Sequence, residues 1–168
     1  MEPDPQRYRA VIGHFATGVT VVTAQGPHGA MGMTTNAVTS LSLDPLLVLA
    51  CFDNSARTLP AVAESGRFGV NVLRAGQEGL SGQFASKLPP EEKFEAVAHR
   101  DENGVPILDG VLAWLACDLQ ELLPGGDHTI GVGRVTAMDD APGGDPLVWY
   151  RGAYTTVAEA SPRARPDA

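Results

Sequence analysis

The sequence predicts a mainly β protein, folded as a closed antiparallel barrel with peripheral α-helices. About seven short runs rich in β-branched and aromatic residues are separated by Gly, Pro, Asp or Asn, which is the pattern of strands joined by turns. Only a few stretches have helical character. The regular alternation of strand and helix that a doubly wound parallel sheet needs is missing.

The chain opens with a predicted helix that ends near His14. Asp4 followed by Pro5 is an N-cap and first-turn signal. Four apolar residues then fall on one helical face: Tyr8, Val11, Ile12 and Phe15.

From Thr17 onward the pattern changes to that of strands. Four are predicted: Val19–Thr23, Thr34–Leu41, Leu46–Phe52 and Phe68–Leu73. Between the third and fourth, Thr58 can cap a helix that Gly66 ends. A second helical stretch, Gln77–Ala85, precedes a Pro-Pro break and the short segment Glu91–Val97.

The last third is again rich in predicted strands. Val111–Leu123 and His128–Met138 are joined by Pro124-Gly125-Gly126-Asp127, a composition suited to a hairpin turn. We expect the inward face of the strand opened by His128 to continue with Ile130 and Val132. Leu147–Tyr150 and Tyr154–Val157 complete the set.

Composition limits the organisation and the function classes. The 168 residues, 43% of them apolar, suit one domain over residues 1–160, and the charged, proline-containing segment 161–168 is predicted to be a disordered tail. A net charge of −8 with no arginine-rich block argues against nucleic acid as a partner. Neither a signal-peptide core nor an apolar stretch of the roughly 20 residues that span a bilayer is present, which predicts a cytoplasmic protein with no membrane partner.

The common catalytic motifs are missing. There is no G-x-G-x-x-G after a strand and no P-loop. The four histidines have no metal-ligand spacing, so no metal site is predicted. Cys51 and Cys117 lie in apolar runs and suggest buried, reduced thiols. Burial would raise the pKa of Cys51, which makes a Cys51–His128 hydrolase a weak hypothesis.

The most informative segment is G-M-T-T-N-A-V-T-S-L-S-L-D-P-L-L-V-L-A-C-F, residues 32–52. It carries more hydroxyl and amide side chains than a barrel core needs. Such residues also suit an exposed strand face. The functional interpretation is that they face the edge of a flat heterocycle with carbonyl and ring-nitrogen groups, as in an isoalloxazine.

This segment resembles the signature of the short-chain flavin reductase family, the reductase components of two-component flavin-dependent monooxygenases. The resemblance continues through five further blocks: residues 54–58, 67–73, 83–85, 126–128 and 150–154. It covers residues 8 to 157. It implies an FMN-binding split β-barrel that forms a homodimer, with the flavin at the subunit interface.

The resemblance also implies roles for single residues. Thr34, Thr35, Asn36 and Ala37 would line the isoalloxazine, with Ser40 and Ser42 nearer the ribityl and phosphate groups and Cys51 beneath. Ser55, Arg57 and Thr58 would hold the phosphate. Their alternative is an ordinary N-cap with a surface arginine, although two hydroxyls, a guanidinium and a helix N-terminus also suit a phosphate physically.

The remaining assignments concern the other side of the flavin. Phe84, Ala85 and Lys87 would close over it, unless they belong to a plain amphipathic helix. His128 would hold the nicotinamide, although a capping or core histidine fits the same position. Arg151 and Tyr154 are candidates for that pocket or are a surface cation and a barrel-filling aromatic.

The predicted activity is therefore hydride transfer from NADH or NADPH to FMN or FAD, with the reduced flavin diffusing to a partner monooxygenase. The sequence does not decide between the two flavins. The lack of an arginine cluster for a 2′-phosphate favours NADH. A non-catalytic flavin-binding or electron-transfer protein is the alternative. A related oxidase of a pyridoxal-type phosphate would call for more basic residues than Arg57 and Lys87.

Overall fold

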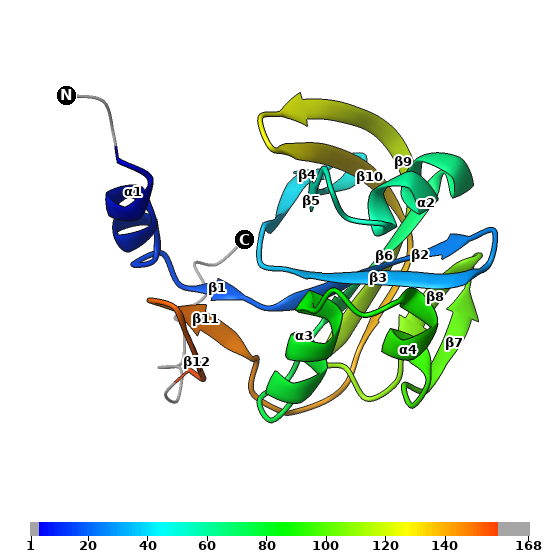
Figure 1. Cartoon of the computed structure of the whole chain (residues 1–168). Helices are drawn as coiled ribbons and strands as arrows, with labels where there is room; N and C mark the ends of the chain where they lie inside the picture. The colour runs from blue at the N-terminus through cyan, green and yellow to red at the C-terminus, as the bar shows by residue number, and fades with distance from the viewer. Residues whose placement is uncertain (1–3, 158–168) are drawn as a thin grey trace.

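The computed structural model describes residues 4–157 (Figure 1). Its helices are α1 (Pro5–Ile12), α2 (Thr58–Ser65), α3 (Glu78–Ala85) and α4 (Pro90–Phe94). The strands of its first half are β1 (Thr17–Gly18), β2 (Thr20–Gly26), β3 (Gly29–Thr35), β4 (Val38–Leu43), β5 (Leu46–Asp53) and β6 (Arg67–Val72). Those of its second half are β7 (His99–Glu102), β8 (Val105–Leu108), β9 (Ala113–Gly125), β10 (His128–Asp140), β11 (Val148–Tyr150) and β12 (Ala153–Thr155).

The strands form three antiparallel sheets. The largest has seven strands in the order β3-β2-β6-β9-β10-β5-β4, and the others are β1-β11-β12 and the hairpin β7-β8. The two edge strands of the large sheet, β3 and β4, are consecutive in the chain. Between them Ala37 accepts a hydrogen bond at 2.9 Å from the amide of Cys51 on β5, so the sheet bends back on itself here. The predicted mainly β class with few helices is confirmed.

One hydrophobic core lies between the large sheet and α2. Phe52 of β5 and Phe68 of β6 are fully buried, and their rings meet edge to face at a centroid distance of 5.8 Å. They occupy the space above β10, where a Cβ on Gly131 would lie 2.7 Å from Phe52 and one on Gly133 would lie 2.4 Å from Phe68. The buried positions of β10 are therefore glycines, because the two phenylalanines fill the volume that side chains would need.

This packing corrects the expected inward face of β10. Ile130 and Val132 were predicted to face inward, but both are only half-buried, and Gly131 and Gly133 face the core instead. An alternation pattern ranks glycine as polar or neutral. It therefore assigned the wrong face to a strand whose core space is filled from the neighbouring strands.

A second core lies against α3 and β8. Phe84, Leu73, Leu108 and Leu147 are buried there. The hairpin β7-β8 that contributes Leu108 was missed by the sequence prediction. Its turn contains Asn103 and Gly104 with φ of 54° and 77°, and the Asn-Gly pair is the signal from which it could have been found.

The predicted strand Thr34–Leu41 is wrong in one respect, because the structure divides it. β3 ends at Thr35 and β4 begins at Val38. The side chain of Thr35 accepts a hydrogen bond from the amide of Ala37 at 3.1 Å, and Asn36 donates to Thr17 at 3.0 Å. These local bonds satisfy the backbone in a bend and compete with a continuous strand.

Helix starts were predicted with mixed success. The carboxylate of Asp4 accepts from the amide of Arg7 at 2.9 Å, which confirms the cap of α1. The expected cap at Thr58 is wrong: α2 begins at Thr58, its N-cap is Arg57, and no side chain caps it. Thr58 is buried instead, and Gly66 ends α2 with φ of 66°, as predicted.

The predicted tail, 161–168, lies outside the described residues, and the single domain over residues 1–160 stays a prediction. Among residues 4–157, no helix has the length and hydropathy needed to cross a membrane.

A buried amide fastens the β7-β8 hairpin to the large sheet. The side chain of Asn71 on β6 donates to the carbonyl of Val21 at 3.0 Å and to the hydroxyl of Thr23 at 3.1 Å, and it accepts from the amide of Leu108 at 2.8 Å. Asn71 is fully buried. All three bonds are therefore made without competition from water.

We predict that Asn71→Leu lowers the free energy of unfolding by roughly 2–4 kcal/mol, because it leaves buried backbone groups without partners. Urea unfolding measures the change. Gln120→Leu, which replaces an exposed amide on β9, serves as control and should stay within about 0.5 kcal/mol of the parent. Equal losses in both variants would contradict the proposed anchor.

Candidate functional site

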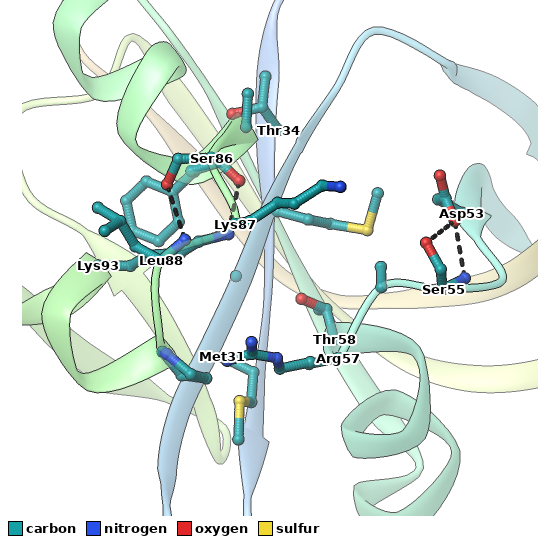
Figure 2. A pocket seen from close by; sticks show the side chains of 16 residues that line it. Met31, Thr34, Asp53, Ser55, Arg57, Thr58, Ser86, Lys87, Leu88 and Lys93 are labelled. Atoms are coloured by element: carbon teal, nitrogen blue, oxygen red, sulfur yellow. Dashed lines mark hydrogen bonds between the residues drawn. The ribbon is translucent and has the colours of Figure 1, made fainter.

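A pocket of about 490 Å³ lies between β3, the loop from β5 to α2, and the segment from α3 to α4 (Figure 2). Residues 31–34 of β3 form its floor. The β5–α2 loop forms one wall with residues 53 and 55–58, and the α3–α4 segment forms the other with residues 84–88, 90 and 93. The pocket thus combines segments that are far apart in the chain.

The α3 wall is fixed to the floor by a close contact between Gly32 and Phe84. A Cβ on Gly32 would lie 2.7 Å from the ring of Phe84, which is 1% exposed. The ring also meets Phe94 of α4 edge to face, with centroids 5.0 Å apart. This aromatic pair holds both short helices beside β3.

The opposite wall is ordered by Asp53, the last residue of β5. Its carboxylate accepts hydrogen bonds from the hydroxyl of Ser55 at 2.6 Å and from the amide of Ser55 at 2.7 Å. These bonds lower the pKa of Asp53 below the ordinary aspartate value. Asn54 then ties the loop to the β9-β10 turn through the carbonyl of Gly126 at 3.1 Å.

The pocket concentrates positive charge in a chain of net charge −8. Its charged lining residues are Arg57, Lys87 and Lys93 against the single carboxylate of Asp53. Figure 2 shows Arg57 and Lys87 reaching into the pocket from opposite sides. The uncapped N-terminus of α2 lies at the same wall and adds partial positive charge. The pocket therefore suits an anionic group such as a phosphate.

Lys93 is partly buried and lies near the positive charge of Arg57. Its ammonium group donates to the carbonyl of Phe84 at 2.9 Å. Burial, and next the positive charge of Arg57, lower the pKa of Lys93 below the ordinary lysine value. An anion bound between the two cations would relieve their repulsion.

The structure brings together seven of the residues that the sequence assigned to the site. They line this one pocket: Thr34, Ser55, Arg57, Thr58, Phe84, Ala85 and Lys87. Two of the hydroxyls expected at a phosphate are already engaged or buried, since Ser55 donates to Asp53 and Thr58 is 2% exposed. Of the groups that the sequence assigned to the phosphate, Arg57 and the N-terminus of α2 remain the direct candidates.

The other predicted flavin-binding residues lie beyond the lining. Thr35, Asn36 and Ala37 continue directly from the floor, and the hydroxyl of Thr35 lies 3.4 Å from the carbonyl of Cys51. Cys117 is buried as predicted, whereas the prediction of a buried Cys51 is wrong, because Cys51 is only half-buried. Burial raises the pKa of both thiols, that of Cys117 to about 12. Ser40 and Ser42, with Asn36, line a second, largely apolar cavity of about 460 Å³.

His128 lies at the rim, paired with Asp53 in the register of β10 and β5. Its Nδ1 is 2.8 Å from the carboxylate of Asp127, and this hydrogen bond, with the charge of His128, lowers the pKa of Asp127. An ionised carboxylate only accepts, so Nδ1 carries a proton, and the Nε2 side of the ring is left for other contacts.

Arg151 and Tyr154 lie outside the lining of the pocket. Arg151 is in the β11-β12 turn with φ of 50°, and its amide donates to Gly13 at 2.9 Å. The hydroxyl of Tyr154 donates to Ser81 of α3 at 2.9 Å.

Two lining residues with charge were not assigned by the sequence prediction, Asp53 and Lys93. Asp53 precedes the assigned Asn54–Thr58 block, and an Asp-Asn-Ser run after a strand is a turn signal that could have identified it. Lys93 has no local signal, because its place depends on how α4 packs against β3.

Comparisons with known proteins agree with the resemblance seen in the sequence. The family described as "Flavin reductase like domain" matches residues 12–158. The chain is 43% identical over 153 residues to a flavin reductase of Pseudomonas putida, covering 90% of this chain and 89% of that protein. It is 39% identical over 157 residues to the reductase subunit HsaB of a flavin-dependent monooxygenase from Mycobacterium tuberculosis, covering 92% and 83%.

The fold agrees as well. The structure of the NADH:FAD oxidoreductase SgcE6 of Streptomyces globisporus superposes with a TM-score of 0.87 at 36% identity, over 95% of this chain and 97% of that one.

We predict that Gly32→Ala lowers both stability and affinity for FMN, because its methyl group displaces the buried ring of Phe84 and with it the α3 wall. Overpacking of this kind costs about 1–3 kcal/mol. Thermal unfolding and flavin fluorescence titration measure the two effects.

Gly79→Ala on α3 is the matched control, since a Cβ there would meet no atom within 4 Å other than its chain neighbours and the backbone of its own helix. It should be neutral or stabilising by up to about 1 kcal/mol, because alanine favours a helix. If Gly32→Ala behaved like this control, the Gly32–Phe84 contact would not define the pocket.

Proposed function

The chain belongs to the flavin reductase-like family, and from that membership we propose that it reduces FMN or FAD with NADH or NADPH. The observation that carries the proposal is the pocket on β3, where Arg57, Lys87, Lys93 and the N-terminus of α2 provide a site for an anion. The floor of this pocket begins the segment that resembles the family signature. The reductase relatives named above support the reaction.

The residues present fit a flavin that carries a phosphate. Arg57 and Lys93 come from the two walls and lie close enough for the charge of one to act on the other. Both FMN and FAD have a phosphate on the ribityl chain, so both flavins remain open. From that anchor, the floor leads through Thr34 to Asn36, where the ring would lie.

The bound flavin would accept a hydride, two electrons with one proton, from C4 of the nicotinamide. The chain's own task is alignment. Correct orientation of two reacting groups contributes up to about 7–11 kcal/mol, whereas one charge-assisted hydrogen bond contributes about 1.5–3 kcal/mol. His128, held by Asp127, would orient the nicotinamide, and backbone amides after Thr34 would stabilise negative charge at the ring edge.

A homodimer with a split-barrel fold is part of this proposal. The apolar face of α1 is exposed, with Tyr8 at 63% and Val11 at 55%, and Phe15, three residues after the helix, is exposed at 71%. The β4-β5 hairpin exposes Leu43 at 83% beside the second cavity. Exposed apolar side chains of this kind typically mark an interface, and a second copy of the chain would cover them. Ser40 and Ser42 would then lie near the subunit boundary.

A flavin-dependent monooxygenase is the proposed consumer of the reduced flavin. HsaB is named as a reductase subunit of such an enzyme, and that name supports the same division of labour for this chain. The reduced flavin would pass between the proteins by diffusion. The cytoplasmic location stays a prediction.

We predict that the purified chain oxidises NADH only when FMN or FAD is added. His128→Ala should raise the KM for NADH about 5- to 10-fold, the loss of one hydrogen bond, and leave the KM for flavin unchanged. Asn36→Ala should do the reverse. Absorbance of NADH at varied flavin measures both. Flavin binding without NADH oxidation would instead support the electron-transfer alternative.

We also predict that Arg57→Gln and Lys93→Met each raise the dissociation constant of FMN about tenfold or more, because each removes a charge-assisted contact with the phosphate. Riboflavin, which has no phosphate, is the matched control ligand and should lose less than about twofold. Fluorescence titration measures both dissociation constants. Equal losses for FMN and riboflavin would place the phosphate elsewhere.

The same titration has a pH dependence. The protonated form of Lys93 binds the phosphate, and its pKa is lowered. FMN affinity should therefore fall with rising pH, and the fall should begin at a lower pH than an ordinary lysine would give. Lys93→Met should lack this fall, and Lys93→Arg should keep its affinity across the range.

A further inference from the structure

We propose that Tyr154 is a positioning residue: its hydroxyl bonds to Ser81, ties α3 to the C-terminal strand pair and thereby orients the α3 wall of the pocket. The inference rests on the proposed function, since the pocket is taken to bind flavin. It differs from the role that the sequence suggested for Tyr154, which was direct contact with the nicotinamide.

Ser81 is the residue at which three elements meet. Its hydroxyl accepts from Tyr154 of β12 at 2.9 Å, and its carbonyl accepts from the hydroxyl of Thr34 of β3 at 2.6 Å. Ser81 itself is fully buried. One residue of α3 is therefore bonded both to the floor of the pocket and to the C-terminal strand pair.

Few side chains hold α3 in place: besides its two buried residues, Leu80 packs partly buried against the second core and Gln83 donates to the carbonyl of Lys93. Within its eight residues only Ser81 and Phe84 are buried, and no side chain caps its N-terminus. Phe84 fixes the end of α3 next to the pocket through Gly32. Ser81, one turn earlier, provides the second point, and two points are needed to set the direction of a helix.

Packing already restricts the side chain of Tyr154 before its hydroxyl bonds to Ser81. Its ring packs edge to face against Trp149 of β11, with centroids 4.9 Å apart. This packing limits the freedom of the side chain before the hydroxyl is placed, so little entropy is lost when the bond to Ser81 forms. The bond is part-buried.

Loss of the Tyr154–Ser81 bond would change the α3 wall of the pocket. Ala85, Ser86 and Lys87 follow α3 directly and line the wall. Without the Tyr154–Ser81 bond, α3 keeps Phe84 and the Thr34–Ser81 bond but loses its connection to the C-terminal strand pair. Lys87 and the backbone around it then occupy more positions, and flavin binding has to order them. The effect falls on flavin affinity and leaves the hydride-transfer step unchanged once flavin is bound.

The experiment compares Tyr154→Phe, Ser81→Ala and the double variant with the parent. Tyr154→Phe keeps the packing on Trp149 and removes only the hydroxyl. Flavin dissociation constants from fluorescence titration, KM for NADH, kcat at saturating flavin and the thermal midpoint are measured for each. Tyr150→Phe is the matched control, because Tyr150 lies on the paired strand β11 with the same 38% exposure.

We expect Tyr154→Phe and Ser81→Ala each to raise the flavin dissociation constant about 3- to 10-fold, the loss of one hydrogen bond. The double variant should be no weaker than either single one, because both remove the same bond. kcat and the KM for NADH should not change. Tyr150→Phe should match the parent.

Each other outcome overturns the inference in a recognisable way. Unchanged flavin affinity in Tyr154→Phe, or additive effects in the double variant, would remove the bond from the mechanism. A higher KM for NADH alone would support the earlier prediction that Tyr154 contacts the nicotinamide. A lower thermal midpoint with unchanged flavin affinity would leave a purely structural role. A parent protein that binds no flavin would refute the proposed function itself.

Discussion

The absence of a side chain at Gly32 lets the ring of Phe84 lie against the backbone of β3, and the pocket depends on this contact. Phe84 carries the end of α3 to the sheet and meets Phe94, which brings α4 beside it. The carbonyl of Phe84 accepts a hydrogen bond from the ammonium group of Lys93. A single buried ring thus sets the position of a wall, of the segment after it and of one cation. Any larger residue at position 32 would push the ring of Phe84, and with it α3, away from β3.

The charge in the pocket follows from this same packing. A chain of net charge −8 repels anions at long range, and only a local concentration of cations can reverse that. Arg57 arrives with the β5–α2 loop, whereas Lys87 and Lys93 arrive with the α3–α4 segment. The cations repel one another across the pocket, and the lowered pKa of Lys93 reflects both its burial and that repulsion. A bound phosphate would hold the two walls together, because it attracts a cation from each.

What the sequence predicted was local, and what it missed depended on packing between distant elements. Alternating and β-branched runs were enough to find β2, β5, β6, β9 and β10, and the capping pattern at Asp4 was enough to find α1. The side chain of Thr35 divided a run that looks continuous. Gly131 and Gly133 reversed the expected face of β10, because Phe52 and Phe68 come from strands far away in sequence. Likewise, the motif blocks located Thr34, Arg57 and Phe84, but Lys93 and Ser81 acquire their places only through the seating of α3 and α4.

The floor and the α3–α4 wall of the pocket differ in how firmly they are built, and this difference would suit a flavin that is released after reduction. The floor belongs to a sheet whose neighbouring strands bury Val22, Phe52 and Phe68. α3 buries only Ser81 and Phe84, and α4 buries no residue. Segments with few buried contacts open at low free energy, while the core stays closed. If reduced flavin is released to another enzyme, the α3–α4 side can open while the floor stays in place. The strength of its few supports would then set how long the flavin stays.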